Sequence, residues 1–232
     1  MEAHLSLSLP DQIVLLLHGP DGRQHGVNHQ VLTPAAELAE LVMYGRAELT
    51  RTAFGGVKIG LLDSTPVGFE PLEHPLSALV GRIAGKGKPI PFQTWLAERR
   101  SAFQEQRWAL RQRGYLEHEP EKLLGFIPRD RYRPNGPLQQ ELIGELGQLA
   151  RGERSPDDRL ALLVAIVYPS GLYRRLLGFD RSQSRRLKHI AKGQDLEGAV
   201  SAAVAATGAV IAGAVGGGGG DGGGGGDGGG GG

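Results

Sequence analysis

The chain has 232 residues and a formal net charge of +1, which allows one domain of ordinary size and argues against a globally basic nucleic-acid-binding protein. It contains no cysteine, which excludes disulfides, thiolate catalysis and cysteine-bound metal, and fits a reducing cytoplasm. Residues 216–232 are fifteen glycines and two aspartates with almost no side chain to bury, so we expect a disordered tail after a folded domain of residues 1–215.

The first predicted elements are a strand and a capped helix. Residues 13–17 form a short, branched, apolar run, and the Pro-Asp-Gly sequence at 20–22 predicts a turn after it. Thr33 before Pro34 has the pattern of an N-cap followed by the favoured first helical residue. Apolar residues then recur at helical spacing until Gly45, which we expect to end the helix.

A hairpin, a connector and two helices follow. Residues 47–52 and 57–62 flank a Phe-Gly-Gly sequence and predict a hairpin, and residues 76–84 predict a short helix after a proline-rich connector. Residues 85–91 form a basic loop with Lys86 and Lys88. We expect one long helix over residues 92–113. Its apolar side would hold Trp95, Leu96, Phe103, Trp108 and Leu110, and its polar side Arg99, Arg100, Arg107, Arg111 and Arg113.

Residues 123–127 and 129–133 predict a second hairpin. In extended chain, Arg129, Arg131 and Arg133 share one face, beside the apolar residues Leu124, Phe126 and Ile127. An apolar wedge next to cations suits an anionic membrane interface. The other interpretation is an edge strand that its charges protect from pairing with other chains.

Five more helices are expected, at residues 137–151, 157–168, 172–177, 181–192 and 196–215. Asp158 suits a helix N-terminus, and Arg159 is expected to pair internally. Residues 198–215 are uncharged, which raises the question of a membrane span, but they are mostly Ala, Val and Gly. We therefore expect a packed helix there. The basic residues of 181–189 are expected on a solvated helix exterior.

No pattern for catalysis or metal binding stands out. His25 and His29 have the spacing of two ligands on a helix, but Gly26 and Asn28 lie between them and no third ligand is suggested. The chain has no GxSxG, Walker-type or helix-opening GxGxxG motif. We expect a non-enzymatic protein without cofactor or metal, built as one mainly α-helical domain with two or three small β-hairpins.

The order of these segments resembles the Golgi phosphoprotein 3 (GPP34) family, which has eukaryotic Golgi members and many bacterial ones. The matching segments are 13–17 with Asp21-Gly22, 39–41 through Gly45-Arg46, Asp63 with Pro66 and Gly68, 93–96, 113–116 and 158–162. The resemblance, to a bacterial-type member, implies a largely helical peripheral membrane protein without catalysis. It also implies lipid recognition, because eukaryotic members bind phosphatidylinositol 4-phosphate through a surface pocket.

The family's pocket uses a Trp and an Arg around the first capped helix and two Arg on the central helix. The surrounding motifs carry these four positions to His25, Pro34, Arg100 and Phe103, so only Arg100 keeps its chemistry. Arg99 and Arg107, with Lys86 and Lys88, would build a different anion site nearby, or they form an ordinary solvated surface. The resemblance also implies that the hairpin at 123–133 reaches toward membrane and mediates homo-oligomerisation.

The sequence thus predicts a cytoplasmic protein that associates peripherally with membrane, on the Golgi only if the source is eukaryotic, by binding an anionic lipid such as phosphatidylinositol 4-phosphate. The predicted headgroup residues are His25, Arg99, Arg100 and Arg107. The predicted membrane hairpin comprises Phe126, Ile127, Arg129, Arg131 and Arg133. The alternative is a soluble protein-binding or oligomeric scaffold that has lost the lipid pocket.

Overall fold

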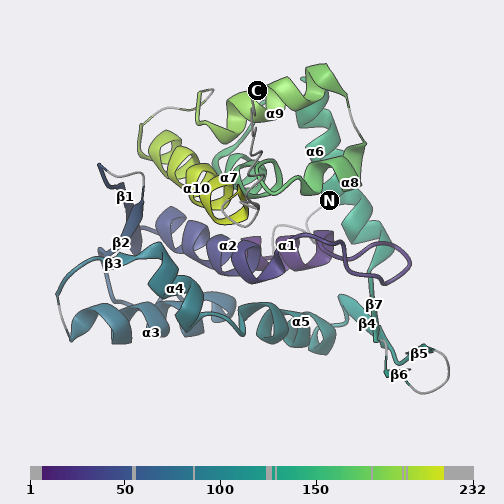
Figure 1. The fold of residues 1–232 in the computed structure, drawn as a ribbon, viewed down its shortest axis with the longest axis horizontal. Helices are drawn as coiled ribbons and strands as arrows, with labels where there is room; N and C mark the ends of the chain where they lie inside the picture. The colour runs from purple at the N-terminus through teal and green to yellow at the C-terminus, as the bar shows by residue number, and fades with distance from the viewer. Residues whose placement is uncertain are drawn as a thin grey trace, which may run out of the picture.

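A computed structural model describes residues 7–53, 56–85, 87–123, 127–128, 130–178, 180–194, 196 and 198–216 (Figure 1). The helices are α1 (Leu9–Leu16), α2 (His29–Met43), α3 (Glu70–Ala84), α4 (Phe92–Glu98), α5 (Ala102–Gln112), α6 (Gly136–Arg151), α7 (Asp158–Val167), α8 (Leu172–Leu177), α9 (Arg181–Ala191) and α10 (Gly198–Gly216). The strands are β1 (Ala47–Arg51), β2 (Val57–Leu61), β3 (Ile90–Pro91), β4 (Leu116–Glu119), β5 (Lys122–Leu123), β6 (Ile127–Pro128) and β7 (Arg131–Pro134). The predicted mainly α-helical fold with small hairpins is confirmed.

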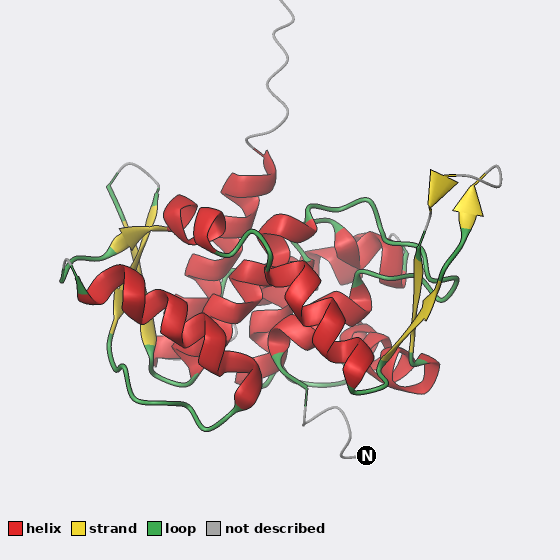
Figure 2. Cartoon of the chain, turned by 90° about the horizontal axis from the view of Figure 1, so that it is seen from below, coloured by secondary structure: helices red, strands yellow, loops and turns green. Residues whose placement is uncertain are grey.

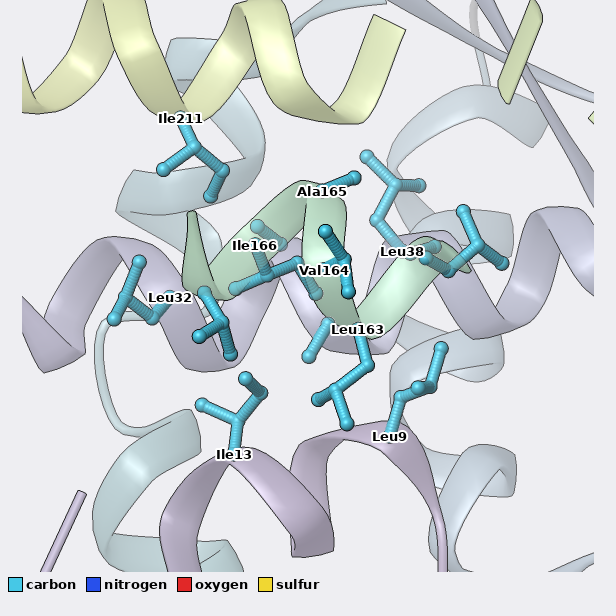
Figure 3. Close-up of a cluster of buried hydrophobic side chains, with 14 of the residues drawn as sticks. Leu9, Ile13, Leu32, Leu38, Leu163, Val164, Ala165, Ile166 and Ile211 are labelled. Carbon is cyan, nitrogen blue, oxygen red and sulfur yellow. The ribbon is translucent and has the colours of Figure 1, made fainter. Parts of the chain in front are cut away.

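Helix α7 forms the centre of the core. Its residues from Leu160 to Val167 are all buried, as expected of a helix that is apolar on every side. Figure 3 shows its side chains between those of α1, α2 and α10, with Ile13, Leu32 and Ile211 among the neighbours. Each fully buried side chain of this size contributes about 1.5–3 kcal/mol, so this contact region dominates stability.

The predicted strand at residues 13–17 is wrong, because most of this run belongs to α1. Ser8 and Asp11 form a capping box in which each side chain accepts a hydrogen bond from the other's backbone N–H, at 3.1 and 3.0 Å. Pro10 fits the first turn. All eight residues of α1 are buried, so the run shows no helical alternation of apolar and polar residues that would separate it from a buried strand.

Helix α2 begins at His29, four residues before the predicted start at Thr33, and includes Pro34 in its interior. Helix α3 likewise begins at Glu70, with Pro71 in its first turn and Pro75 inside it. Prolines in the first two turns of a helix are a weaker stop than the sequence interpretation assumed. The predicted end of α2 is confirmed, since Gly45 has φ of 66° just after the helix.

The predicted long helix at 92–113 is broken into α4 and α5, with a turn from Arg99 to Ser101 between them. The break changes which residues face the interior. Arg99 is only 3% exposed, whereas Trp108, predicted on the apolar side, is 63% exposed. Phe103 and Leu110 are buried as predicted.

The sheets lie at opposite ends of the helical body (Figure 2). At one end, β1 and β2 form the predicted hairpin and β3 adds a third strand. At the other, one long hairpin has a base ladder, β4 with β7, and a tip ladder, β5 with β6. The predicted strands at 123–127 and 129–133 therefore cover only part of it. Phe126 and Arg129 lie outside the described residues, and the Ile127 side chain is not described.

The five helices predicted over residues 137–215 are confirmed within about two residues at each end. Helix α10 packs on α2, α7, α9 and β1, in agreement with the expectation of a packed helix. Within the described part of the chain, no helix combines the length and hydropathy that a membrane crossing requires. The predicted glycine tail at 216–232 lies outside the described residues from 217 on, and Gly216 is the last residue of α10.

Candidate functional site

Three segments that are distant in sequence meet beside the base of the long hairpin. They are the loop after α1 (residues 19–28), helix α5 and strand β7. The loop and the strand are joined by a hydrogen bond of 3.0 Å from Tyr132 N–H to Gly22 O. Gly22 has φ of 76°, and a Cβ there would meet Arg131 Cβ at 3.0 Å, so the turn and the close approach both require glycine.

Arg107 of α5 lies at the centre of this junction. Its guanidinium stacks over the rings of Tyr132 and Phe103, with centroid distances of 4.0 and 5.2 Å. It forms no ion pair with the part of the chain that the structure describes. A cation held on aromatic faces keeps its N–H groups directed outward in the plane, where an oxyanion can accept two of them.

Histidines surround Arg107 and are held neutral. The His29 ring lies 4.4 Å from the Phe103 ring, and the His18 ring is stacked with Phe103 at 5.9 Å. Burial lowers the pKa of His18 to about 4, and burial and then the Arg107 charge lower the pKa of His29. At neutral pH the positive charge of this junction therefore belongs to Arg107.

Two more of the predicted headgroup residues, His25 and Arg100, lie near its edge. His25 is half-buried in the loop, and its pKa is lowered by burial and then by the charge of Arg175 from α8. Arg100 is exposed in the turn before α5, three and seven residues before Phe103 and Arg107, and has no ion pair in the described structure. Phe103 and Arg107, four residues apart, lie on one side of α5, and Arg100 precedes the first turn of that helix.

Arg99 points away from this surface. Its guanidinium donates to both carboxylate oxygens of Glu37, at 2.9 and 2.7 Å, and to Glu105 at 2.7 Å. The expectation that Arg99 lies on the polar side of a helix is thus wrong, because the break between α4 and α5 turns it into the core. Burial raises the pKa of Glu37, and the Arg99 pair opposes that shift. The carboxylates of Glu37 and Glu105 already pair with Arg99, so its guanidinium is not available to a lipid phosphate.

The model of the Golgi phosphoprotein 3 (GPP34) family matches residues 9–207, which is most of the chain and all of the junction. The chain belongs to the GPP34 family. No curated protein matches it. The family assignment made from the sequence motifs is therefore confirmed, and with it the expected helical fold.

Three of the four family pocket positions lie at or near the junction, although their chemistry differs. His25 lies in the loop, Phe103 in α5, and Arg100 in the turn that precedes α5. The fourth, Pro34, is buried in α2, where its carbonyl accepts a 2.8 Å hydrogen bond from Trp95 Nε1–H. In this GPP34 chain, Pro34 and Phe103 occupy the places of two arginines and His25 occupies the place of the Trp. Arg107 supplies a cation one helical turn further along α5.

Two of the hairpin arginines, Arg131 and Arg133, are neutralised by acids of the same hairpin. Arg131 makes a two-point ion pair with Glu121, at 2.6 and 2.7 Å, and Arg133 donates to Glu119 at 2.9 Å. These pairs fit the interpretation of a charged, protected strand. The sequence interpretation overlooked the acids at 117–121 because it started the hairpin at residue 123.

Sequence reasoning also missed Tyr132 and Arg175. Tyr132 alternates with the hairpin arginines and so lies on the opposite strand face, a signal that was present in the pattern. Arg175 comes from a distant helix, and no local pattern connects it with His25. The internal pair predicted for Arg159 is confirmed, since Arg159 donates to Glu40 at 2.6 Å. In the described residues, no group of three potential ligands is placed to hold a metal ion.

Proposed function

We propose that this GPP34 protein is a non-enzymatic peripheral protein that binds anionic lipid headgroups, phosphatidylinositol 4-phosphate among them, through the Arg107 side of α5. The observation that carries the proposal is the contrast between its arginines. Arg99, Arg131 and Arg133 have carboxylate partners, whereas Arg100 and Arg107 have none in the described structure. An arginine without a carboxylate partner at a partly exposed junction is available to a phosphate.

Liposome co-sedimentation tests this function. Vesicles of neutral lipid, of generic anionic lipid and of phosphatidylinositol 4-phosphate at matched surface charge are compared at low and physiological salt. Basic residues contribute about 1 kcal/mol each at an anionic surface, so Arg100→Gln with Arg107→Gln should weaken binding about thirtyfold. Preference for the phosphoinositide would support a headgroup pocket, and equal binding to any anionic surface would support electrostatic contact alone.

The matched control is Arg181→Gln with Arg185→Gln, which removes the same charge from the exposed side of α9. An equal loss in both double variants would mean that overall charge, and not the junction, determines binding. No binding of the unmodified protein to any vesicle would overturn the proposal.

The second candidate is a soluble protein-binding or oligomeric scaffold. It is favoured by Trp108, whose large apolar ring is mostly exposed on α5, and by the internal neutralisation of the hairpin. A scaffold of this kind would show concentration-dependent self-association by analytical ultracentrifugation, reduced by Trp108→Ala, with no binding to lipid. A monomer that binds vesicles would contradict it.

A further inference from the structure

A second surface, on α9 and α10, combines an apolar groove with unpaired cations. The groove has a volume of about 540 Å³, within the range of about 300–1,000 Å³ typical of ligand sites. Its apolar lining comes from Tyr168, Pro169, Ala191 and the α10 residues Ala205, Gly208, Ala209 and Ala212. Arg51, Lys188 and Lys192 complete it on the polar side.

The groove exists because α10 crosses the end of α9 closely. A Cβ at Gly208 would lie 2.7 Å from Ala191 O, so only glycine allows this approach. Ser201 Oγ–H donates to Gly193 O at 2.8 Å and fixes the start of α10 to the end of α9. The side chains that α10 turns toward the groove are no larger than a methyl group, so an apolar channel remains between the helices.

The charge of the groove is one-sided. Arg51, Lys188 and Lys192 are exposed, and none has an ion pair in the part of the chain that the structure describes. No acid is among the groove-lining residues. The groove thus offers a hydrocarbon surface next to three cations, which is complementary to a molecule with an apolar chain and an anionic head.

The groove also has a suitable position for a membrane ligand. In Figure 2 the C-terminal end of α10 and the tip of the long hairpin lie at the same, upper edge of the molecule, while Figure 1 shows them far apart. The C-terminal half of α10, which lines the groove, therefore approaches the side toward which the hairpin projects.

We propose that the α9–α10 groove binds one anionic phospholipid molecule, with its phosphate at Arg51, Lys188 and Lys192 and an acyl chain along Ala205, Gly208, Ala209 and Ala212. This site is distinct from the Arg107 junction and does not depend on it. The proposed function concerns headgroups at a membrane surface, whereas this groove holds part of the lipid chain as well.

The test uses monomeric dihexanoylphosphatidylglycerol and isothermal titration calorimetry on the full chain. We expect 1:1 binding, at least about tenfold weaker binding of dihexanoylphosphatidylcholine, and no measurable binding of glycerol phosphate, since charge and chain both contribute. Equal binding of the choline lipid would overturn the role of the cations. Glycerol phosphate binding as tightly as the intact lipid would overturn the role of the groove.

Two pairs of variants locate the site. Lys188→Gln with Lys192→Gln should weaken binding about thirtyfold, whereas Arg181→Gln with Arg185→Gln, the same charge loss on the same helix, should leave it within about twofold. Ala209→Phe should abolish binding by filling the groove, and Ala202→Phe, on the exposed side of α10 outside the groove lining, should not. Equal effects within either pair would overturn the proposal.

Arg100→Gln with Arg107→Gln separates this inference from the proposed function. That variant should bind vesicles about thirtyfold more weakly and keep its binding of the short-chain lipid in the groove. If it loses both, the groove is not an independent site and the inference fails. If the groove variants lose the short-chain lipid while the unmodified protein shows no junction-dependent vesicle binding, the inference stands and the proposed function fails.

Discussion

Arg99 and Glu37 form the most consequential pair in the molecule at the scale of single residues. Both side chains are almost fully buried, and each compensates the charge of the other. Removal of one member of a buried pair leaves a charge without a partner and typically costs about 3–5 kcal/mol. We therefore expect Arg99→Met to lower the free energy of unfolding by that amount, measured by urea denaturation monitored by circular dichroism.

The comparison variant is Arg99→Met combined with Glu37→Leu, which removes both charges from the interior. Its loss of stability should be clearly smaller than that of the single variant, because apolar replacements of a buried pair are often tolerated. A double variant as unstable as Arg99→Met would show that packing, and not the charge on Glu37, sets the cost.

His18 makes folding stability depend on pH. Its Nδ1–H donates to Val14 O at 2.8 Å, its Nε2 has no partner in the described structure, and Arg107, His25 and His29 all disfavour its protonation. With a pKa of about 4 when folded and about 6.5 when unfolded, the unfolded chain takes up the proton first as pH falls. The preference for the folded state that comes from neutral His18 is therefore complete above pH 6.5. It is lost as pH falls from 6.5 to 4.

From pH 7.5 to pH 5, His18 should cost the protein about 2 kcal/mol of unfolding free energy. His18→Gln carries no titrating group, so its stability should fall by about that much less over the same interval. Denaturant melts of both proteins at the two pH values provide the measurement. Because only the difference across pH is compared, any constant destabilisation by glutamine cancels. Identical pH dependence in both proteins would contradict the prediction.

At the scale of elements, the long hairpin is a nearly charge-balanced arm. Arg131→Gln with Glu121→Gln removes one ion pair without changing net charge, so vesicle binding should stay within about twofold and stability within about 1 kcal/mol. Arg131→Gln alone leaves Glu121 unbalanced and should weaken binding to anionic vesicles. Co-sedimentation of the three proteins compares them. If the double variant binds as weakly as the single one, Arg131 contacts lipid directly.

The elements also show which structural information the sequence contains. Helices with an apolar stripe and clear caps, such as α6 and α9, were predicted close to their observed bounds. Helix α1 was mistaken for a strand because complete burial removes periodicity, although Ser8 and Asp11 carried the capping signal. The break between α4 and α5 was missed. It places Arg99 beside Glu37, a partner 62 residues away in the sequence that local periodicity does not reveal.

The candidate site was predictable in part for the same reasons. Arg107 was predicted on the polar side of the central helix, and the family motifs located His25, Arg100 and Phe103. The acids that neutralise Arg131 and Arg133 required the register of the hairpin, which depends on strands assigned only in three dimensions. Glu37 was the available signal for Arg99, because a carboxylate among the apolar positions of α2 needs a buried partner.

At the scale of the whole molecule, the hairpin tip and the end of α10 mark two separated points on one side of the fold. Figure 1 views the molecule down its shortest axis and shows the two elements at different ends, and Figure 2 shows both projecting in one direction. A bilayer on that side would meet both elements at once. Two weak contacts on one surface combine into a stronger one, because the second contact forms at high effective concentration.

This arrangement predicts that changes at the two sites cause additive losses of binding free energy to vesicles. Leu124→Ser with Phe126→Ser changes two apolar residues that follow β5 in the sequence and lie outside the described structure. Lys188→Gln with Lys192→Gln changes the groove. Because β5 and β6 lie far from α10 (Figure 1), the free-energy losses measured by vesicle partitioning should add within about 0.5 kcal/mol when the variants are combined. If the hairpin and the groove instead contacted two different bilayers, the unmodified protein would bridge vesicles. Light scattering would detect this bridging as aggregation. Two results would contradict a single membrane-facing side: a combined variant that binds vesicles as tightly as the groove variant alone, or vesicle bridging by the unmodified protein. Additive losses without bridging would mean that the hairpin and the groove act on the same bilayer.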